Sequence, residues 1–422
     1  MKDNRRKYEE LRREYPLFEF HDYEIKVDND ALVMKFDFRV GESVRFAPQM
    51  RLNAGVYARD VDFSELEGLV FHIGLIELIS YWKSVCSPKI LIHHFRLDEE
   101  QQKWWKKLYY KGLGEFFYQN GLNPSQDDFV EFVFDDNARP FAELSFNRVD
   151  DDGRVLVPIG GGKDSVVTLE ELRREKQIVP FIINPRGATL GCAHVAGFTD
   201  TDHIVVLKRQ IAPELLELNA RGFLNGHTPF SAMLAFYTLL VSRITGVRPI
   251  ALSNESSANE PTIPGTEINH QYSKSFEFEE DFRRYVSLYM NDCSHYYSYL
   301  RPLTELQIAE RFSKYDQYFD VFKSCNAGSK EDKWCCHCSK CLFAYIILSP
   351  FISDEKMIRI FGADLLEQED MMTYFDELTG IAENKPFECV GTIEEVREAI
   401  RRIIPTRSDK LLVRHYISEL SK

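Results

Sequence analysis

The sequence contains no run of about 18 apolar residues, the length that a membrane-spanning helix needs. Its first residues, Met-Lys-Asp-Asn-Arg-Arg, are charged where a secretory signal peptide would carry an apolar core. An excess of positive charge is also absent, because the formal net charge is -14. Nucleic-acid-binding proteins usually display clustered Lys and Arg. We therefore expect a cytoplasmic protein that neither inserts into a membrane nor binds nucleic acid.

Two familiar phosphate-binding spacings are also missing from the glycine-rich stretch at residues 155–165. The stretch lacks both the Gly-x4-Gly-Lys-Ser/Thr order of Walker loops and the Gly-x-Gly-x-x-Gly order of Rossmann loops. It consists instead of an apolar run at 155–159, three glycines, three polar residues and a helix-like segment at 166–176. The glycines and polar residues are Gly160, Gly161, Gly162, Lys163, Asp164 and Ser165.

This order predicts a strand, a tight loop and a helix. Glycines let backbone N–H groups crowd around an anion, and the positive end of the following helix favours negative charge. The loop is therefore a candidate phosphate-binding site. The competing interpretation is a glycine-rich turn that binds nothing, and the full string of residues argues against it.

Further strand patterns follow the loop at residues 178–183, 203–207 and 249–253, the last after an apolar helix at 230–244. Strands that alternate with helices predict an α/β fold with a doubly wound, mostly parallel sheet. Ligands in such sheets bind beyond the carboxyl ends of the strands. We therefore expect residues 160–165, 184–187 and 253–260 to share one rim.

The region before this sheet carries no recognisable catalytic signature. Strand patterns at residues 18–20, 23–27 and 32–40, with a core helix at 63–85, predict an N-terminal α+β region over 1–150. The nucleotide-binding domain would then span 151–324. A cysteine-containing helical region would follow at 325–422, with helices at 342–348, 354–361, 367–378, 393–403 and 411–420.

Two polar segments are candidates for chemistry. Residues 253–260 follow a strand, and Glu255 and Glu260 offer the hard oxygen ligands that Mg²⁺ prefers. A solvated turn is the alternative there. Residues 269–275 place three groups close together that could move a proton or hold an anion. These three are His270, Tyr272 and Lys274.

His227 lies in the segment that precedes the apolar helix at 230–244. Thr228 and Pro229 have the pattern of a helix start, so capping explains them without any other function. His227 is left as a candidate phosphate contact.

Four cysteines have metal-ligand spacing. The order Cys-x9-Cys-x2-Cys-x2-Cys can close a tetrahedral Zn²⁺ site, and four sulfur ligands imply a structural ion. Cys336 and His337 interrupt the pattern, and we leave Cys336 out of the ligand set. The alternatives are a reduced cysteine cluster and, with less support, an iron–sulfur cluster. The four proposed ligands are Cys325, Cys335, Cys338 and Cys341.

The loop at 160–165 resembles the Ser-Gly-Gly-x-Asp-Ser pyrophosphatase loop of enzymes that split ATP between the α and β phosphates, with Gly160 in place of the first Ser. The wider chain resembles the ATP-dependent UDP-N-acetylmuramoyl-L-alanyl-L-glutamate epimerases of peptidoglycan synthesis. The likeness rests on the loop, on 226–231, 253–255 and 269–275, on Ile79-Ser-Tyr-Trp-Lys83 and Gly112-Leu-Gly-Glu-Phe116, and on the cysteines.

The resemblance implies a fold of the pyrophosphatase-loop type and an isomerase whose substrate is a muramyl-peptide nucleotide. ATP would convert a glutamyl carboxylate to an acyl-adenylate, which makes the α-proton removable, and AMP and diphosphate would be released. Residues 160–165 would bind the nucleotide together with Asn184, Ser253, Asn254 and Glu255. Lys163 would neutralise charge at phosphorus, and Asp164 or Glu255 would hold Mg²⁺.

For the two proton transfers, the resemblance leaves several groups open and does not select a pair. These groups are His270, Tyr272, Lys274, His194 and Cys192.

Other functions remain open at this point. The cysteine spacing is also similar to that of 7-cyano-7-deazaguanine synthases, so the chain could be another adenylating enzyme of amide, nitrile or thiolation chemistry. A nucleotide-binding sensor without turnover and a scaffold with a vestigial loop are further alternatives. The sequence indicates no oligomeric state.

Overall fold

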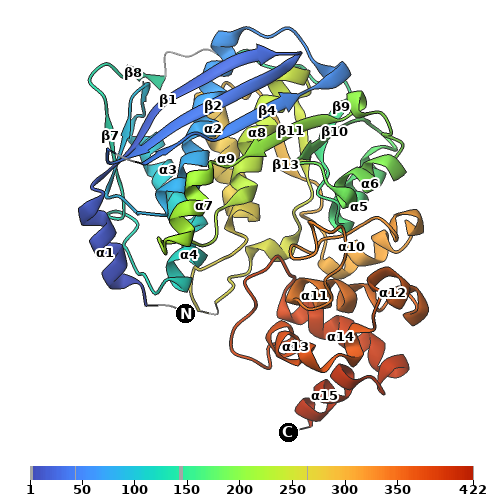
Figure 1. The fold of residues 1–422 in the computed structure, drawn as a ribbon. Coiled ribbons are helices and arrows are strands. Elements are labelled where there is room, and N and C mark those ends of the chain that lie inside the picture. The colour runs from blue at the N-terminus through green and yellow to red at the C-terminus, as the bar shows by residue number, and fades with distance from the viewer. Residues whose placement is uncertain (1–2, 43, 142–145, 264, 422) are drawn as a thin grey trace. The chain divides into compact units, whose positions relative to one another are not determined.

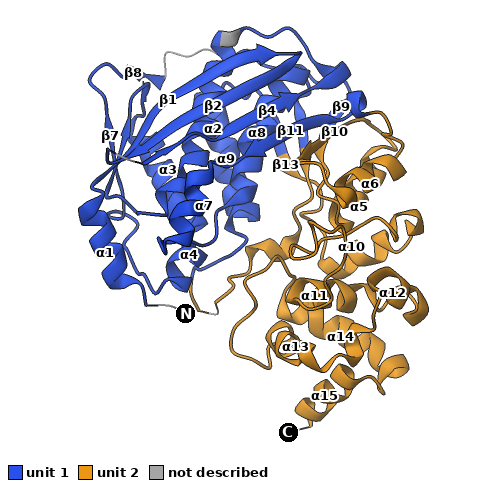
Figure 2. Cartoon of the chain, viewed as in Figure 1, with its two compact units in different colours: residues 1–156, 201–250, 267–296 blue, residues 157–200, 251–266, 297–422 orange. Residues whose placement is uncertain are grey.

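The computed structural model describes residues 3–42, 44–141, 146–263 and 265–421. Figure 1 shows the α/β fold that the alternating pattern predicts. Two compact units divide the chain, and the first comprises residues 1–156, 201–250 and 267–296 (Figure 2). The second comprises residues 157–200, 251–266 and 297–422. Among the described residues, no helix combines the length and apolar character needed to cross a membrane.

The first unit contains a mixed sheet with the strand order β11-β4-β2-β1-β5-β7, in which β3 also pairs with β2. Strands β1, β2, β3, β4 and β11 pair antiparallel, whereas β1 with β5 and β5 with β7 are parallel. The strands are β1 Leu17–Asp28, β2 Ala31–Val40, β3 Val44–Phe46, β4 Gln49–Asn53, β5 Lys89–Ile92, β7 Glu131–Phe134 and β11 Val205–Gln210, with a separate pair β6 Phe95–Arg96 and β8 Arg139–Pro140.

The expectation of a mostly parallel sheet is therefore corrected. The strand pattern at 203–207 becomes β11, which pairs antiparallel with β4 of the N-terminal region. Tight hairpin connections bring β1 to β4 together in antiparallel order, and β11 adds to that edge. Local pattern predicted the strand correctly but not its neighbour, because pairing partners come from distant segments.

Helices of the first unit provide its core. Helix α2 packs against β1, β2 and α8, and its buried side chains include Phe71, Trp82 and the polar Glu77. The Glu77 carboxylate accepts bonds of 2.6 and 2.8 Å from the Arg209 guanidinium, which makes a charge inside the core tolerable. The helices are α1 Arg5–Glu14, α2 Phe63–Trp82, α3 Glu99–Gly112, α4 Gly114–Gln119, α7 Pro213–Ala220, α8 Phe230–Thr245 and α9 Phe276–Tyr289.

Strands β9, β12 and β13 start in the first unit and end in the second, whereas β10 lies wholly in the second. In the order β13-β12-β9-β10, strand β9 pairs parallel with β12, as the alternating pattern predicts. The polar segments at 160–165 and 253–260 follow these two strands. The strands are β9 Arg154–Pro158, β10 Gln177–Ile183, β12 Pro249–Leu252 and β13 His295–Ser298.

The second unit adds helices after these strands. Helix α5 packs against α10, and α11 packs against α10, α13 and α14 in a helical C-terminal region (Figure 1). The helices are α5 Lys163–Leu172, α6 Gly187–Val195, α10 Glu305–Phe312, α11 Ser339–Leu348, α12 Asp354–Phe361, α13 Met372–Thr379, α14 Ile393–Arg407 and α15 Leu411–Leu420. The compact units are discontinuous, and the predicted domain boundaries at 150 and 324 stay a prediction.

One glycine of the loop is required by its backbone. Gly161 has a φ of +83°, and a Cβ there would lie 2.9 Å from the carbonyl carbon of Ala188 at the start of α6. Gly160 has no heavy atom within 4 Å of the corresponding position. The sharp turn between β9 and α5 therefore depends on Gly161.

We predict that Gly161→Ala lowers the free energy of unfolding by about 1–3 kcal/mol, because the new methyl group meets both a positive φ and a backbone atom. Gly160→Ala is the matched control and should change stability by less than about 0.5 kcal/mol. Urea unfolding of both variants measures the difference. Equal losses in the two variants would contradict the requirement at Gly161.

Candidate active site

The strand, loop and helix predicted around residues 160–165 are present in the second unit. Gly162 is the N-cap of α5, and the Ser165 hydroxyl donates a 3.0 Å bond back to the Gly162 carbonyl. The Gly161 carbonyl accepts a 2.8 Å bond from the backbone N–H of Lys323. The loop is thus held in place by its own helix and by a distant segment. Its amides begin a ten-residue helix, a suitable position for an anion.

Lys163 lies at the start of α5 and is almost completely buried. Its ammonium group is 2.5 Å from the Asp164 carboxylate and also forms an ion pair with Glu305, the first residue of α10. Burial alone would lower the pKa of Lys163, but the carboxylates of Asp164 and Glu305 outweigh burial and raise it. Lys163 is therefore a permanent cation at this loop.

Glu305 carries an unusual concentration of negative charge around it. Burial raises the pKa of its carboxyl, the Lys163 ammonium opposes this, and the charges of Asp164 and Glu255 raise the pKa further. Its backbone N–H donates a 2.8 Å bond to Glu395. The sequence segments around Asp164 and Glu255 thus act on the same carboxyl group, as their expected position along one rim implied.

The segment after β12 has a buried core at Asn254, Glu255 and Ser257 and is not simply a solvated turn. Glu255 is 4% exposed and accepts a 3.0 Å bond from the Ser257 hydroxyl, while the Asn254 amide donates to Ser298 at 3.0 Å. The Ser253 hydroxyl oxygen is buried and has no hydrogen-bond partner among the described residues. Glu260 lies farther along and is paired with Lys385.

These observations fit a nucleotide with a divalent cation. Buried hydroxyl groups in proteins normally have a hydrogen-bond partner. A bound nucleotide could supply the partner that the Ser253 hydroxyl lacks. Asp164 and Glu305 pair with the buried Lys163, and the charge of Glu255 also acts on Glu305, so the group holds more acidic residues than its one cation can offset. A cation such as Mg²⁺ would offset the surplus. The donor set is all oxygen, which suits Mg²⁺ better than a softer metal.

The other predicted residues of this unit occupy different surroundings. Asn184 directly follows β10 and has a φ of +47°. Cys192 is buried, its sulfur lies 3.7 Å from the Gly161 carbonyl oxygen, and burial raises its pKa to about 12. Such a thiol supports the loop and is a poor base at neutral pH. His194 is exposed near the end of α6.

A second group of functional side chains lies in the first unit. Glu115, His227 and His270 offer ligand atoms within 4.8 Å of one another. The Glu115 carboxylate is 2.5 Å from Nδ1 of His270 and 3.3 Å from Nδ1 of His227, and the two imidazole rings are 4.5 Å apart. A carboxylate only accepts hydrogen bonds, so the Nδ1 atom of His270 carries the proton of its bond to Glu115. Nε2 is then the basic nitrogen of a neutral His270 ring.

Burial and charge keep one of these two histidines neutral. Burial lowers the pKa of His227 to about 3, and the charges of His270 and Lys83 act in the same direction. Lys83 donates to the Gly226 carbonyl and, at 2.5 Å, to the Thr228 hydroxyl. Burial also lowers the pKa of Lys83, to about 8, and the charge of Arg209 contributes.

The two rings form one cluster. Their centroids are 4.5 Å apart, and both rings face the Glu115 carboxylate. We expect such a pair to act from one side of a bound substrate.

The two remaining candidates lie in the short turn Tyr272–Lys274. Tyr272 is 5% exposed, the Lys111 ammonium lies 5.7 Å from its ring centre, and burial raises the pKa of its hydroxyl. A hydroxyl with a raised pKa is a weak acid. Lys274 is half-buried.

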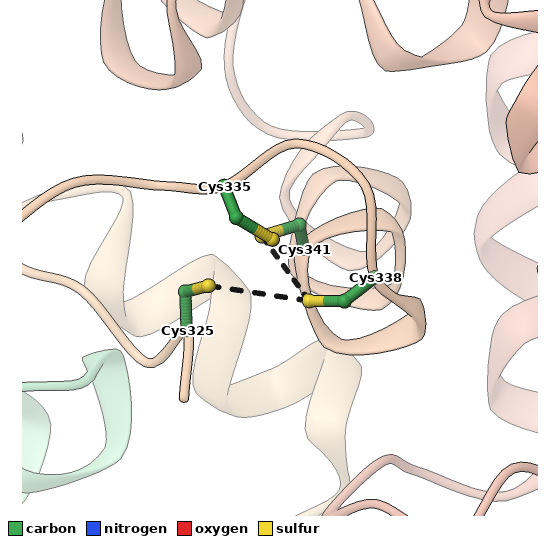
Figure 3. Close-up of side chains that lie close together, drawn as sticks. All are labelled: Cys325, Cys335, Cys338 and Cys341. Carbon is green, nitrogen blue, oxygen red and sulfur yellow. Dashed lines mark hydrogen bonds between the residues drawn. The ribbon is translucent and has the colours of Figure 1, made fainter. Parts of the chain in front are cut away.

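The four cysteines predicted as zinc ligands converge (Figure 3). Their sulfur atoms lie within 4.8 Å of one another, with 3.5 Å between Cys338 and Cys341 and 4.0 Å between Cys325 and Cys338. Cys335 lies 3.7 Å from Cys341. Four thiol groups at these distances suit a tetrahedral metal with sulfur ligands.

The two interrupting residues have other partners. Cys336 has a φ of +59°, and its sulfur lies 3.2 Å from the Phe361 carbonyl oxygen. The Nδ1 atom of His337 is 2.7 Å from the Asp370 carboxylate. The positive φ directs the Cys336 side chain away from the other four cysteines.

The sequence patterns did not single out three residues at these sites. Glu115 and Lys83 stand inside motifs quoted for the family resemblance but received no role. Glu305 stands in Thr304-Glu-Leu-Gln307, which forms a capping box at the start of α10. Helix capping is enough to account for this pattern, so the buried carboxylate has no separate signal in the sequence.

Two family models match the chain. The MurL N-terminal domain matches residues 9–299, and the MurL C-terminal domain matches residues 321–422. A UDP-N-acetyl-alpha-D-muramoyl-L-alanyl-L-glutamate epimerase of Xanthomonas oryzae pv. oryzae is 38% identical over 338 residues, which cover 77% of this chain and 72% of the relative.

Proteins with the same description occur in two other bacteria. The Micromonospora protein is 36% identical over 324 residues, covering 75% of this chain and 70% of the relative. The Salinispora tropica protein is 36% identical over 325 residues, covering 75% and 69%. Epimerases are isomerases, so the matches define the class of enzyme. The chain belongs to the UDP-N-acetyl-alpha-D-muramoyl-L-alanyl-L-glutamate epimerase family, as the motifs predicted.

We predict that Glu305→Ala lowers the free energy of unfolding by about 2–4 kcal/mol, because Lys163 loses a buried partner. The single variant Lys163→Met leaves Glu305 without this partner and should also be less stable. The double variant Lys163→Met/Glu305→Ala removes both charges and should recover most of the loss. Urea unfolding of the two single variants and the double variant measures the coupling. Losses that simply add in the double variant would contradict a direct interaction.

Proposed function

We propose that this chain converts the terminal L-Glu of UDP-N-acetylmuramoyl-L-Ala-L-Glu to D-Glu with the consumption of ATP. The observation that carries the proposal is the 36–38% identity, over about three quarters of the chain, to three proteins named as epimerases of that substrate. The proposed location is the cytoplasm, where ATP is available.

The role of ATP follows from the acidity of the substrate. Removing the α-proton of a free carboxylate would create an enolate with two negative charges. In an acyl-adenylate the carboxylate charge is gone, so the same step places only one negative charge on the enolate. In the proposed sequence, the glutamyl carboxylate attacks the α-phosphorus of ATP and diphosphate leaves. The α-proton departs from one face and a proton returns on the other. Water then hydrolyses the acyl phosphate bond and releases AMP.

The residues proposed for activation all belong to the second unit. Residues 160–165 would hold the phosphates through backbone N–H groups, with Asn184, Ser253 and Asn254 as further contacts. Lys163 is fixed as a cation by its carboxylate partners and would offset charge at phosphorus. Asp164 and Glu255 would hold Mg²⁺, which neutralises phosphate charge when it is bound. This assignment makes the fold one of the pyrophosphatase-loop type.

The proton transfers are assigned to the first unit. His270, oriented by Glu115, would remove or return the proton through Nε2, with His227 as its neutral neighbour. Because the two imidazoles act from one face, the opposite face needs another group. Lys274 is our candidate for it, since the Tyr272 hydroxyl is buried with a raised pKa.

The decisive experiment is incubation with Mg-ATP and the muramyl dipeptide nucleotide in deuterated water, followed by measurement of AMP, diphosphate, glutamate configuration and α-deuterium. The proposal expects all four changes together. AMP without D-Glu would overturn epimerisation and favour another adenylating enzyme, such as one similar to the 7-cyano-7-deazaguanine synthases. ATP binding without any AMP would favour a sensor.

We predict that His270→Asn reduces α-deuterium incorporation by about 10²–10⁴-fold, because the general base is lost, while AMP release persists. His415→Asn is the matched control: it also removes an imidazole bonded to a carboxylate, 2.8 Å from Asp376, but lies in α15. The control should retain both activities. Equal deuterium incorporation in the two variants would exclude His270 from proton transfer.

We also propose that the four cysteines hold a structural Zn²⁺. Cys338→Ser should lower the zinc content of the purified protein by one equivalent, because an oxygen replaces one of four sulfur ligands. Cys336→Ser changes a thiol two residues earlier that faces the Phe361 carbonyl, and this variant should keep its zinc. Elemental analysis measures both. Unchanged zinc in Cys338→Ser would remove the site from the proposal.

A further inference from the structure

A row of polar residues continues three parallel strands of the first unit. In the register of this sheet, Ile92 of β5 lies opposite Phe20 of β1 and Phe134 of β7. The backbone bonds continue one residue farther, with lengths of 3.3 and 3.0 Å. Adjacent strands are about 4.8 Å apart, so residues in one row bring their side chains together. The residues that follow the paired row are His21, His93 and Asp135.

A local irregularity in β1 places a fourth side chain beside them. The pairing of β1 with β2 shifts register between Phe20 and Asp22, so His21 is the extra residue of a β-bulge. Bulges commonly redirect side chains at functional sites. Glu19, two residues earlier, has its Oε2 atom 3.8 Å from Nδ1 of His21 and 3.1 Å from Nε2 of His93.

Both ring nitrogens of His93 face carboxylates, and the single N–H of a neutral imidazole can serve only one of them. Its Nε2 atom faces Glu19, while its Nδ1 atom is 3.4 Å from the Asp135 carboxylate. A neutral imidazole has a single N–H, and carboxylates only accept, so one of these contacts would set a lone pair against a carboxylate. A metal ion at Nε2 removes the conflict and leaves Nδ1–H for Asp135. Carboxylates orient metal-bound histidines in this way.

His21 supplies an independent observation. Its Nδ1 atom is buried and has no hydrogen-bond partner among the described residues, although its ring is 4.9 Å from the ring of His93. Buried polar atoms in proteins normally have a partner. The ligand atoms of Glu19, His21 and His93 all lie within 4.8 Å of one another, so one ion could contact all three.

The surroundings suit a divalent cation. Asp135 is held by the backbone N–H of Asn137 at 2.9 Å, which fixes its carboxylate. Arg39 of β2 lies opposite Glu19 and is positively charged. Its guanidinium is paired with Asp37 at 2.8 Å, which offsets that charge. Two imidazoles and one carboxylate form a ligand set that Zn²⁺ commonly accepts, and a fourth position can remain for water.

We propose that Glu19 and His21 of β1 and His93, which directly follows β5, bind a Zn²⁺ ion, with Asp135 as the residue that orients His93. The ligands lie in or directly after adjacent strands, which keep them in place before the metal arrives. Their side chains are 23–33% exposed, so an ion can enter from solvent. This site is separate in sequence and residue type from the cysteine cluster.

The test measures zinc binding by the full chain after chelation and equilibrium dialysis against Zn²⁺, compared with the His21→Asn/His93→Asn variant. The matched control is His94→Asn, because His94 is bonded to Asp22 at 3.0 Å outside the ligand set. We expect the wild-type chain and the control to bind one equivalent more than the double variant. Asp135→Asn should weaken the affinity of this site for Zn²⁺ about 10–100-fold.

Thermal unfolding distinguishes a lost ligand set from a damaged fold. Without zinc, the double variant should melt as a cooperative transition, and added Zn²⁺ should raise the melting temperature further in the wild-type chain and the control than in the double variant. Equal zinc binding by all three proteins would overturn the proposal. Loss of all zinc from the Cys338→Ser variant would overturn it as well, because the site of Glu19, His21 and His93 should still hold its own equivalent.

Discussion

The buried ion pair between Lys163 and Glu305 is the constraint on which the second unit depends. Lys163 begins α5 directly after the glycine loop, and Glu305 begins α10. The pair joins two helix starts that are far apart in sequence, and the Glu305 backbone N–H continues the connection to Glu395 of α14. Because an unpaired buried charge is costly, the loop, α10 and α14 must keep their positions together. The same contact fixes a cation at the proposed phosphate site.

Two carboxylate–imidazole clusters of the first unit have different surroundings and therefore different proposed chemistry. The side chains of Glu115, His227 and His270 are 12–19% exposed, and burial keeps His227 neutral. Desolvated groups of this kind suit proton transfer. Glu19 in β1 and His93 just after β5, in contrast, are partly exposed to solvent, and a second carboxylate, Asp135, lies on the other side of His93. That arrangement suits a metal ion more than a general base.

Local pattern predicted the longer elements well. The helix expected at 354–361 is present with those bounds, because Gly362, at a φ of +82°, ends it. The strand, glycine loop and helix around Gly161 also formed as expected. Short strands such as His295–Ser298 were missed, because four residues contain too little periodicity to be distinguished from a turn. The convergence of the four cysteines followed from spacing alone, since close residues in sequence stay close in space.

The sequence by itself determined the α/β class, the family, the glycine loop and the cysteine ligand set, because each rests on neighbouring residues or on identity to relatives. Only the tertiary structure decided which strands pair, that Glu305 joins Lys163, and that Glu115 holds two histidines. These contacts join residues separated by more than 100 positions, such as Lys163 and Glu305 or Glu115 and His270. No local period records such contacts, because they arise only when distant segments are buried together.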